Sequence, residues 1–189
     1  MARWQPNAPQ RLVVAALELF EERGYDNTTV VEIAERAGLT KSSFFRHFPD
    51  KREVLFGGDT MTDLVAAGIA AAPDEATPLE AVADALDLIG REAFTPDRRA
   101  FGARRRAVIA ANPELREREA LKGLRLTAAV SESLERRGIP GLTARVAAEL
   151  GALAWDLAYE RWSDPAADAE FGDLARRALA EVRAAGSRC

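Results

Sequence analysis

Apolar residues recur along most of the chain at the three- and four-residue spacing of amphipathic helices. In the first such stretch the apolar positions are Leu12, Ala15, Ala16, Leu19 and Phe20. Asn7 is suited to cap the start of this helix, and Gly24 is suited to end it. Because strict alternation of apolar and polar residues is found nowhere, we expect an all-α fold without strands.

Two short helices are predicted after the first. Thr29 is suited to cap the earlier one, and Glu32, three residues later, completes a capping box. Gly38 ends this helix after about two turns, because glycine adopts a positive φ without a steric cost. Thr40 then caps a second short helix, which we expect over residues 41–48.

A long helix is predicted from residue 51 to 72, and the domain boundary is expected inside it. We therefore divide the chain into a three-helix domain over residues 1–56 and a helical bundle over residues 57–189. Gly57-Gly58 is either a tolerated break between domains or a compliant joint. The later bundle helices are placed near 78–94, 97–111, 113–138, 142–163 and 166–185. Together with the four helices before them, they make about nine helices in all.

Residues 29–48 have the pattern of a helix-turn-helix. Two short helices are joined by a tight turn that contains Gly38, and inward packing is expected for Ile33, Ala37, Leu39 and Phe48. The outward face of the second helix is then formed by Thr40, Lys41, Ser42, Ser43 and Arg46. Hydroxyl and ammonium groups at the start of a helix suit phosphates and base edges in a DNA major groove.

The overall charge by itself does not indicate nucleic-acid binding. The chain has 26 Lys and Arg against 30 Asp and Glu, a net charge of −4. Residues 1–56 hold 8 of each sign, however, so the acidity belongs to the rest of the chain. Within residues 40–52, Lys41, Arg46, Lys51 and Arg52 outnumber the single Asp50, which leaves a local positive patch.

Several function classes find no support in the sequence. One His and one Cys cannot form a zinc site, and His47 is the only histidine available to a catalytic triad. We therefore expect no metal, no cofactor and no enzyme, although catalysis by carboxylates alone stays open. The sequence has neither a long apolar run nor a signal peptide, so we expect no membrane association and a cytoplasmic protein.

Residues 9–58 resemble the DNA-binding domain of the TetR/AcrR family of bacterial transcriptional regulators. The stretches that carry the resemblance are Ala15 to Tyr25, Thr28-Thr29-Val30, Ile33 to Leu39 and Phe44 to Lys51. The resemblance implies backbone contacts to DNA by Thr29, Thr40, His47 and Lys51. Where the family usually has a tyrosine, this chain has Phe45, which is counted among the expected DNA-binding residues although it lacks the hydroxyl. Phe44, Phe45 and Phe48 are expected to pack rather than to stack on bases.

The same resemblance implies a mechanism and partners. Family members are homodimers that bind a palindromic double-stranded operator, usually as repressors, and that release it when a small ligand enters the bundle. An activator, a protein-interaction adaptor and a helical-bundle enzyme are the alternatives. Residues 104–119 are similar to the mycofactocin-type subgroup, which would imply acyl-CoA-like ligands. The nearby arginines are either a solvated face or an anion site, and they are Arg98, Arg99, Arg104, Arg105 and Arg106.

Two sets of residues are singled out in the bundle. Aromatic side chains at helical spacing are either core or the lining of an apolar ligand pocket. The expected ligand-binding residues are Phe94, Phe101, Arg105, Trp155, Tyr159 and Trp162. Heptad-like apolar positions suit a four-helix dimer interface, although an internal core predicts the same pattern. The expected interface residues are Val146, Leu150, Leu153, Leu157, Phe171, Leu174, Ala178 and Val182.

Overall fold

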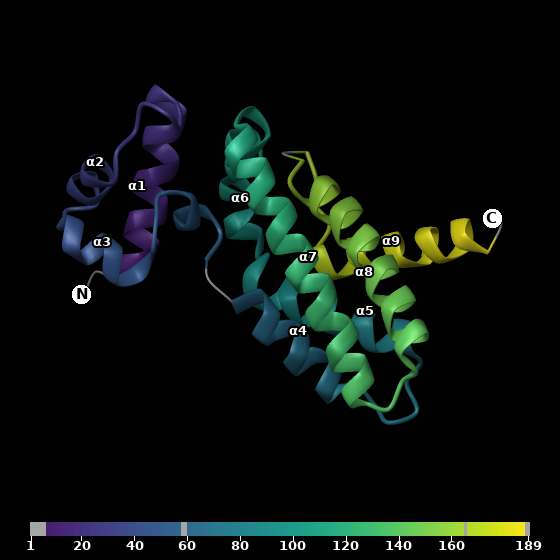
Figure 1. Ribbon diagram of the computed structural model, residues 1–189. Helices are drawn as coiled ribbons and strands as arrows, with labels where there is room; N and C mark the ends of the chain where they lie inside the picture. The colour runs from purple at the N-terminus through teal and green to yellow at the C-terminus, as the bar shows by residue number, and fades with distance from the viewer. Residues whose placement is uncertain (1–6, 58–59, 165, 188–189) are drawn as a thin grey trace, which may run out of the picture. The chain divides into compact units, whose positions relative to one another are not determined.

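The computed structural model describes residues 7–57, 60–164 and 166–187, and every regular element in these ranges is helical. The all-α prediction and the expected nine α-helices are confirmed for these residues (Figure 1). Two short 3-10 helices, η1 (Arg52–Leu55) and η2 (Pro96–Arg98), interrupt the series. The α-helices are α1 (Ala8–Arg23), α2 (Val30–Arg36), α3 (Lys41–His47), α4 (Thr60–Ala71), α5 (Pro78–Ala93), α6 (Arg99–Ala111), α7 (Pro113–Arg136), α8 (Gly141–Trp162) and α9 (Phe171–Gly186).

The chain divides into two compact units. The first unit consists of Met1–Gly58 together with Arg104–Glu119. The second consists of Asp59–Ala103 and Ala120–Cys189. The sequence pattern indicates a boundary in the same region, near residue 57, but gives no sign that the end of α6 and the start of α7 group with the N-terminal helices.

Two helix boundaries differ from the sequence prediction. The helix expected over residues 51–72 is instead the short η1 followed by α4, because Gly57 has a φ of +65° that interrupts the helical backbone. Gly58, the second residue of the supposed joint, lies outside the described residues. The last helix begins at Phe171 rather than near residue 166, since the Asp164 carboxylate accepts the backbone N–H of Ala166 and holds a turn there.

The first unit is built on the buried faces of α1, α2 and α3. Each helix begins at the cap that the sequence predicts: the side chains of Asn7, Thr29 and Thr40 accept backbone N–H groups of Gln10, Glu32 and Ser43. The core side chains include Leu12, Leu17, Leu19, Phe20, Ile33, Ala34 and Phe44. This core fixes the orientation of α3 against the two preceding helices.

A charged side chain from α1 holds the turn between α2 and α3. Nη2 of Arg11 donates to the carbonyl of Ala37 and, at 3.4 Å, to the carbonyl of Gly38. Gly38 has a φ of +66°, and a Cβ there would lie 2.7 Å from the same guanidinium nitrogen. The turn therefore depends both on a residue without a side chain and on an arginine 27 residues earlier in the sequence.

The second unit places α5 against α4, α8 and α9. Its core is rich in alanine, and small residues allow the helices to approach closely. One close approach of two backbones joins α4 to α5, where a Cβ on Gly68 would lie 2.5 Å from Cα of Ala85. Gly90 on α5 similarly faces the backbone of Gly172 on α9. These contacts leave no room for a methyl group at the helix crossings.

Replacing Arg11 with alanine is expected to loosen the turn between α2 and α3. Two carbonyl groups lose a charged donor, which costs about 1–3 kcal/mol and speeds local amide exchange by roughly tenfold or more. Hydrogen exchange of residues 37–44 in the full chain measures this. Arg23→Ala on the same helix is the control, because its ion pair with Glu32 is exposed and contributes little. Equal exchange in the two variants would contradict the role of Arg11.

Replacing Gly68 with alanine is expected to destabilise the second unit by about 1–3 kcal/mol, because the added methyl group overlaps Ala85. Gly123 on α7 is the matched control, since a Cβ there meets no atom within 4 Å. Gly123→Ala is expected to leave stability unchanged or to raise it by up to about 1 kcal/mol through helix propensity. Thermal unfolding followed by circular dichroism compares the two, and a Gly68→Ala protein as stable as wild type would refute the close crossing.

Candidate nucleic-acid interface and ligand site

The packing of three phenylalanines decides which face of α3 is exposed. Phe44 is fully buried and Phe48 is nearly so, and both rings contact each other. Phe45 points the other way and is 48% exposed, with its ring edge against Phe44. The expectation that all three pack inside is therefore wrong for Phe45, because neighbouring positions on a helix face different directions.

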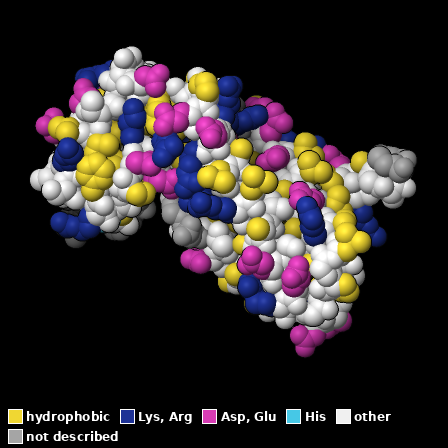
Figure 2. All heavy atoms as spheres, in the orientation of Figure 1, with side chains coloured by type: hydrophobic (Ala, Val, Ile, Leu, Met, Phe, Trp, Pro, Cys, Tyr) yellow, Lys and Arg dark blue, Asp and Glu magenta, His cyan; other side chains and the backbone are white. Residues whose placement is uncertain are grey.

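The exposed face of α3 carries positive charge. Lys41, Ser42, Arg46 and His47 are all exposed, and Ser43 is half-buried. The ammonium of Lys41 lies 6.0 Å from the centroid of the Phe45 ring. Figure 2 shows Lys and Arg side chains in dark blue and Asp and Glu side chains in magenta on the visible surface. None of these α3 side chains is a carboxylate, so the face can accept an anion.

The threonines at the starts of α2 and α3 are engaged in helix capping. The Thr29 hydroxyl and backbone N–H both bond the Glu32 carboxylate at 2.8 Å, and they hold the pKa of that carboxyl below its usual value. A lowered folded pKa means that this contribution is present at neutral pH and is lost only as the pH falls through that pKa. Thr40 caps α3 and also bonds the Ser43 hydroxyl at 3.0 Å. Both hydroxyls retain lone pairs but have their strongest partners within the chain.

Lys51 is tied to the turn between α1 and α2. Its Nζ donates to the carbonyls of Tyr25 at 2.8 Å and Thr28 at 3.0 Å, and it lies 4.0 Å from the centroid of the Tyr25 ring. Burial raises the pKa of the Tyr25 hydroxyl well above its usual value, so that ring stays neutral. Two of the three ammonium protons are therefore used inside the unit. The expected contact of Lys51 with a DNA phosphate remains a prediction, and it would use the third ammonium proton.

Ion pairs join residues 104–119 to the N-terminal helices inside the first unit. Arg104 binds the Glu21 carboxylate through Nε and Nη2 at 2.5–3.1 Å, and Arg118 pairs with the largely buried Glu53. Arg105 donates to the carbonyl of Leu55 at 2.8 Å and pairs with Glu119 at 3.2 Å. Arg105 was expected to bind ligand in the bundle. The structure instead groups it with the first unit, because its guanidinium is taken by these partners.

In the second unit, five aromatic rings form one cluster. Phe94, at the end of α5, stacks on Phe171 at 4.4 Å and contacts Trp155, Tyr159 and Trp162 at 5.0–5.6 Å. Four of the expected ligand-binding residues are thus brought together, and the fifth ring, Phe171, was missed because its heptad spacing indicated the dimer face. The other expected aromatic, Phe101, is half-buried and makes none of these ring contacts.

The expected dimer residues separate into two groups. Phe171, Leu174 and Ala178 on α9 are buried in the core of the second unit, which leaves them little surface for an interface. Val146 and Leu153 on α8 are 50% and 55% exposed. Leu150, Leu157 and Val182 are half-buried. Leu142, at the start of α8 and 79% exposed, continues the same face and was overlooked because it lies at the predicted helix boundary.

The part of the chain that the structure describes contains no group of three or more His, Cys, Asp and Glu side chains that could hold a metal. Within the same residues, none of the helices combines the length and the apolar character needed to cross a bilayer.

The comparison with known families and proteins agrees with the first unit. Residues 12–56 match the family model described as bacterial regulatory proteins, tetR family. The chain is 38% identical over 77 residues to the transcriptional regulator TcmR of Streptomyces glaucescens, covering 40% of this chain and 34% of that protein. It is 43% identical over 44 residues to the transcriptional activator FasR of Mycolicibacterium smegmatis, covering 23% of this chain and 20% of that protein. It thus spans about a third or less of these two relatives.

The comparison with solved structures extends over nearly the whole chain. NalD of Pseudomonas aeruginosa, described as the secondary repressor of the MexAB-OprM multidrug efflux pump, superposes with a TM-score of 0.59. The match covers 94% of this chain and 95% of NalD at 21% identity, which shows a shared fold. Residues 12–56 therefore have a helix-turn-helix of the TetR type, and the described residues share an all-helical, TetR-like fold.

Proposed function

We propose that this protein is a homodimeric repressor that binds a palindromic operator and releases it when a small ligand enters the second unit. The observation that carries the proposal is the exposed face of α3, where Lys41, Arg46 and His47 project without a neighbouring carboxylate on the helix. A recognition helix reads bases with its N-terminal residues, which places Lys41, Ser42 and Ser43 toward the groove. Binding to chromosomal DNA would place the protein in the cytoplasm.

The remaining DNA-binding residues are proposed to position the helix on the phosphate backbone. Thr29 and Thr40 stand at the N-termini of α2 and α3, where backbone N–H groups favour anions. His47 lies exposed at the end of α3, and Lys51 keeps one ammonium proton for a phosphate. Phe45, with no hydroxyl, offers an apolar surface that suits a thymine methyl group or a sugar.

The ligand is proposed to be small and largely apolar. The aromatic cluster of the second unit provides the apolar surroundings, and a cavity of about 230 Å³ lies beside Phe94 and Phe171. An acyl-CoA-like ligand has weaker support, because the arginines expected to hold its phosphates do not converge. Arg104 and Arg105 belong to the first unit and are paired with Glu21 and Glu119, whereas Arg99 belongs to the second.

Repression is preferred over activation on the basis of the family resemblance alone. The relatives that match the helix-turn-helix include the activator FasR, so the matched segment by itself is compatible with repression and with activation. Activation is therefore the second candidate. A transcription assay with the purified protein and its own upstream DNA separates them: the protein lowers transcript yield if it represses and raises it if it activates.

Dimerisation is proposed to use the exposed apolar face of α8. Leu142, Val146 and Leu153 leave most of an apolar stripe in solvent, and Figure 2 shows hydrophobic side chains on the visible surface in yellow. A hollow of about 530 Å³ along this face is lined by Pro78, Leu79, Leu142, Val146 and Leu150, among others. An apolar face of this kind is stabilised when a second copy covers it.

Replacing Lys41 with alanine is expected to weaken binding to the selected palindrome by about 1–3 kcal/mol, roughly 5- to 150-fold, if its ammonium contacts a base. A palindrome is first selected from random DNA, and gel shifts are then measured at several stated salt concentrations. Lys122→Ala, on α7 in the second unit, is the matched control and should leave affinity unchanged. A protein that selects no palindrome at or below about 150 mM salt would refute the proposed function.

The double variant Leu142→Glu/Leu153→Glu is expected to be monomeric, because two carboxylates in an apolar interface lose their hydration. Light scattering after size exclusion should fall from twice 20.5 kDa to 20.5 kDa, and affinity for the full palindrome should fall with it. Leu124→Glu is the control, since Leu124 is 69% exposed but lies on α7. A dimer that survives the double substitution would exclude this face.

A further inference from the structure

Two buried hydrogen-bond donors in the second unit have no acceptor. Nε1 of Trp162 and Nε of Arg99 are both inaccessible to solvent, and neither has a hydrogen-bond partner among the described residues. Trp162 is only 1% exposed as a whole. Buried N–H groups are nearly always paired, so an orphaned donor calls for an explanation. Two of them side by side indicate a place for an acceptor that the chain itself does not supply.

Arg99 and Trp162 lie close together. Cζ of Arg99 is 5.9 Å from the centroid of the Trp162 ring. The two terminal nitrogens of Arg99 donate to the carbonyls of Ala167 and Ala169, between α8 and α9, which fixes the guanidinium in place. Both acceptors are neutral, and no ion pair joins Arg99 to a carboxylate of the described residues. The orphaned Nε–H therefore belongs to a cation whose charge is not neutralised.

The surroundings of this pair are aromatic. The Trp162 ring contacts Phe94 at 5.0 Å, Tyr159 at 6.1 Å and Phe171 at 6.4 Å. In such apolar surroundings, attraction between a cation and an anion is less screened than in water. A neutral acceptor would pair the donors but leave the charge of Arg99 uncompensated, and a cationic guest would be repelled by that charge. A negatively charged acceptor would satisfy both donors and that charge.

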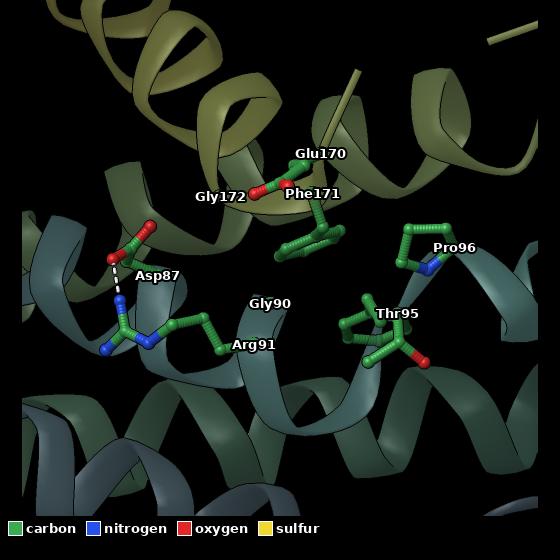
Figure 3. A pocket seen from close by; sticks show the side chains of 9 residues that line it. Asp87, Gly90, Arg91, Thr95, Pro96, Glu170, Phe171 and Gly172 are labelled. Atoms are coloured by element: carbon green, nitrogen blue, oxygen red, sulfur yellow. Dashed lines mark hydrogen bonds and ion pairs between the residues drawn. The ribbon is translucent and has the colours of Figure 1, made fainter. Parts of the chain in front are cut away.

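A route to this position begins at the cavity of about 230 Å³ between α5 and α9. Phe94, Thr95, Pro96 and Phe171 line it, and Figure 3 labels Phe171, Thr95 and Pro96 among the residues that surround it. Phe94 lines the cavity and also contacts the Trp162 ring, so one aromatic ring separates the cavity from the indole. Phe94 follows the last residue of α5, where its backbone leaves the helix. Rotation of its side chain would open a path from the cavity to the indole.

We propose that Arg99 and Trp162 bind the carboxylate of a small aromatic or alkyl acid, whose apolar part lies among the rings of Phe94, Trp155 and Phe171. This inference rests on the proposed function, since it names the chemical class of ligand that the second unit takes. One carboxylate oxygen accepts the indole N–H, and Nε–H of Arg99 donates to the same carboxylate.

The first test needs only the wild-type protein and three probes of similar shape. Calorimetry compares 1-naphthylacetate with the neutral 2-(1-naphthyl)ethanol and the cationic 2-(1-naphthyl)ethylamine. The acid is expected to bind about tenfold or more tightly than the alcohol, because a hydrogen bond to a charged group is stronger than one to a neutral group. The amine is expected not to bind. Equal or tighter binding of the alcohol or the amine, or no binding of the acid at millimolar concentration, overturns the proposal.

The second test assigns the binding to the two donors. Trp162→Phe removes the indole N–H, and Arg99→Lys keeps the charge but removes Nε–H; each should weaken 1-naphthylacetate binding by roughly tenfold. The neighbouring, exposed Arg98→Lys is the matched control and should leave affinity unchanged. Circular dichroism checks folding, and if Trp162→Phe does not fold, Arg99→Lys decides. Affinity unchanged in the folded variants means that buried water satisfies the donors, and the proposal fails.

A gel shift with the selected palindrome separates this inference from the proposed function. A protein that binds the palindrome but not the acid overturns the inference and leaves the DNA-binding function intact. A second outcome is that the protein binds the acid with the expected dependence on Arg99 and Trp162 and remains bound to the palindrome. That result supports the site and overturns ligand-induced release. Release of the palindrome by the acid, lost in Arg99→Lys and retained in Arg98→Lys, supports both.

Discussion

The burial of Phe44 is the constraint on which the DNA-reading surface depends. A helix of seven residues has only two turns, so a single buried side chain sets its rotation about its own axis. With Phe44 fully enclosed and Phe48 closing the end, Lys41, Ser42 and Phe45 must face outward. Arg11 then sets where α3 begins, because its guanidinium holds the carbonyls of the preceding turn. The reading face is thus a consequence of hydrophobic packing.

Charge has different tasks in the two units. In the first, Glu21 and Glu53 bind arginines from residues 104–119, so much of the positive charge near the N-terminal helices is neutralised within the unit. What is left over on α3 is small and local, which agrees with a net charge of −4 for the whole chain. In the second unit, Arg99 is held by carbonyls alone and keeps its charge beside an indole. That uncompensated cation gives the aromatic cluster its preference for an anionic group.

The second unit combines closely packed helices with an aromatic cluster in which two hydrogen-bond donors are unpaired. Gly68 and several alanines bring the helices of the second unit into close contact at their crossings. The aromatic cluster at the other end of α5 uses large, rigid rings instead, and leaves two donors unpaired. Small residues pack efficiently, whereas large rings of fixed shape leave spaces that another molecule can fill. Stability and ligand binding are therefore placed at different positions along the same helix.

The sequence by itself determined the all-α class, the three caps at Asn7, Thr29 and Thr40, and the helix-turn-helix, because these depend on residues three or four positions apart. Tertiary structure decided what depends on distant residues: that Arg105 packs with the N-terminal helices, that Phe171 completes the aromatic cluster, and that Lys51 binds the carbonyls of Tyr25 and Thr28. Helical spacing shows that one face of a helix is apolar. It does not show whether that face packs against the same chain or against a second copy. Only the packing of α9 showed that Phe171, Leu174 and Ala178 are internal, while α8 keeps an exposed apolar face.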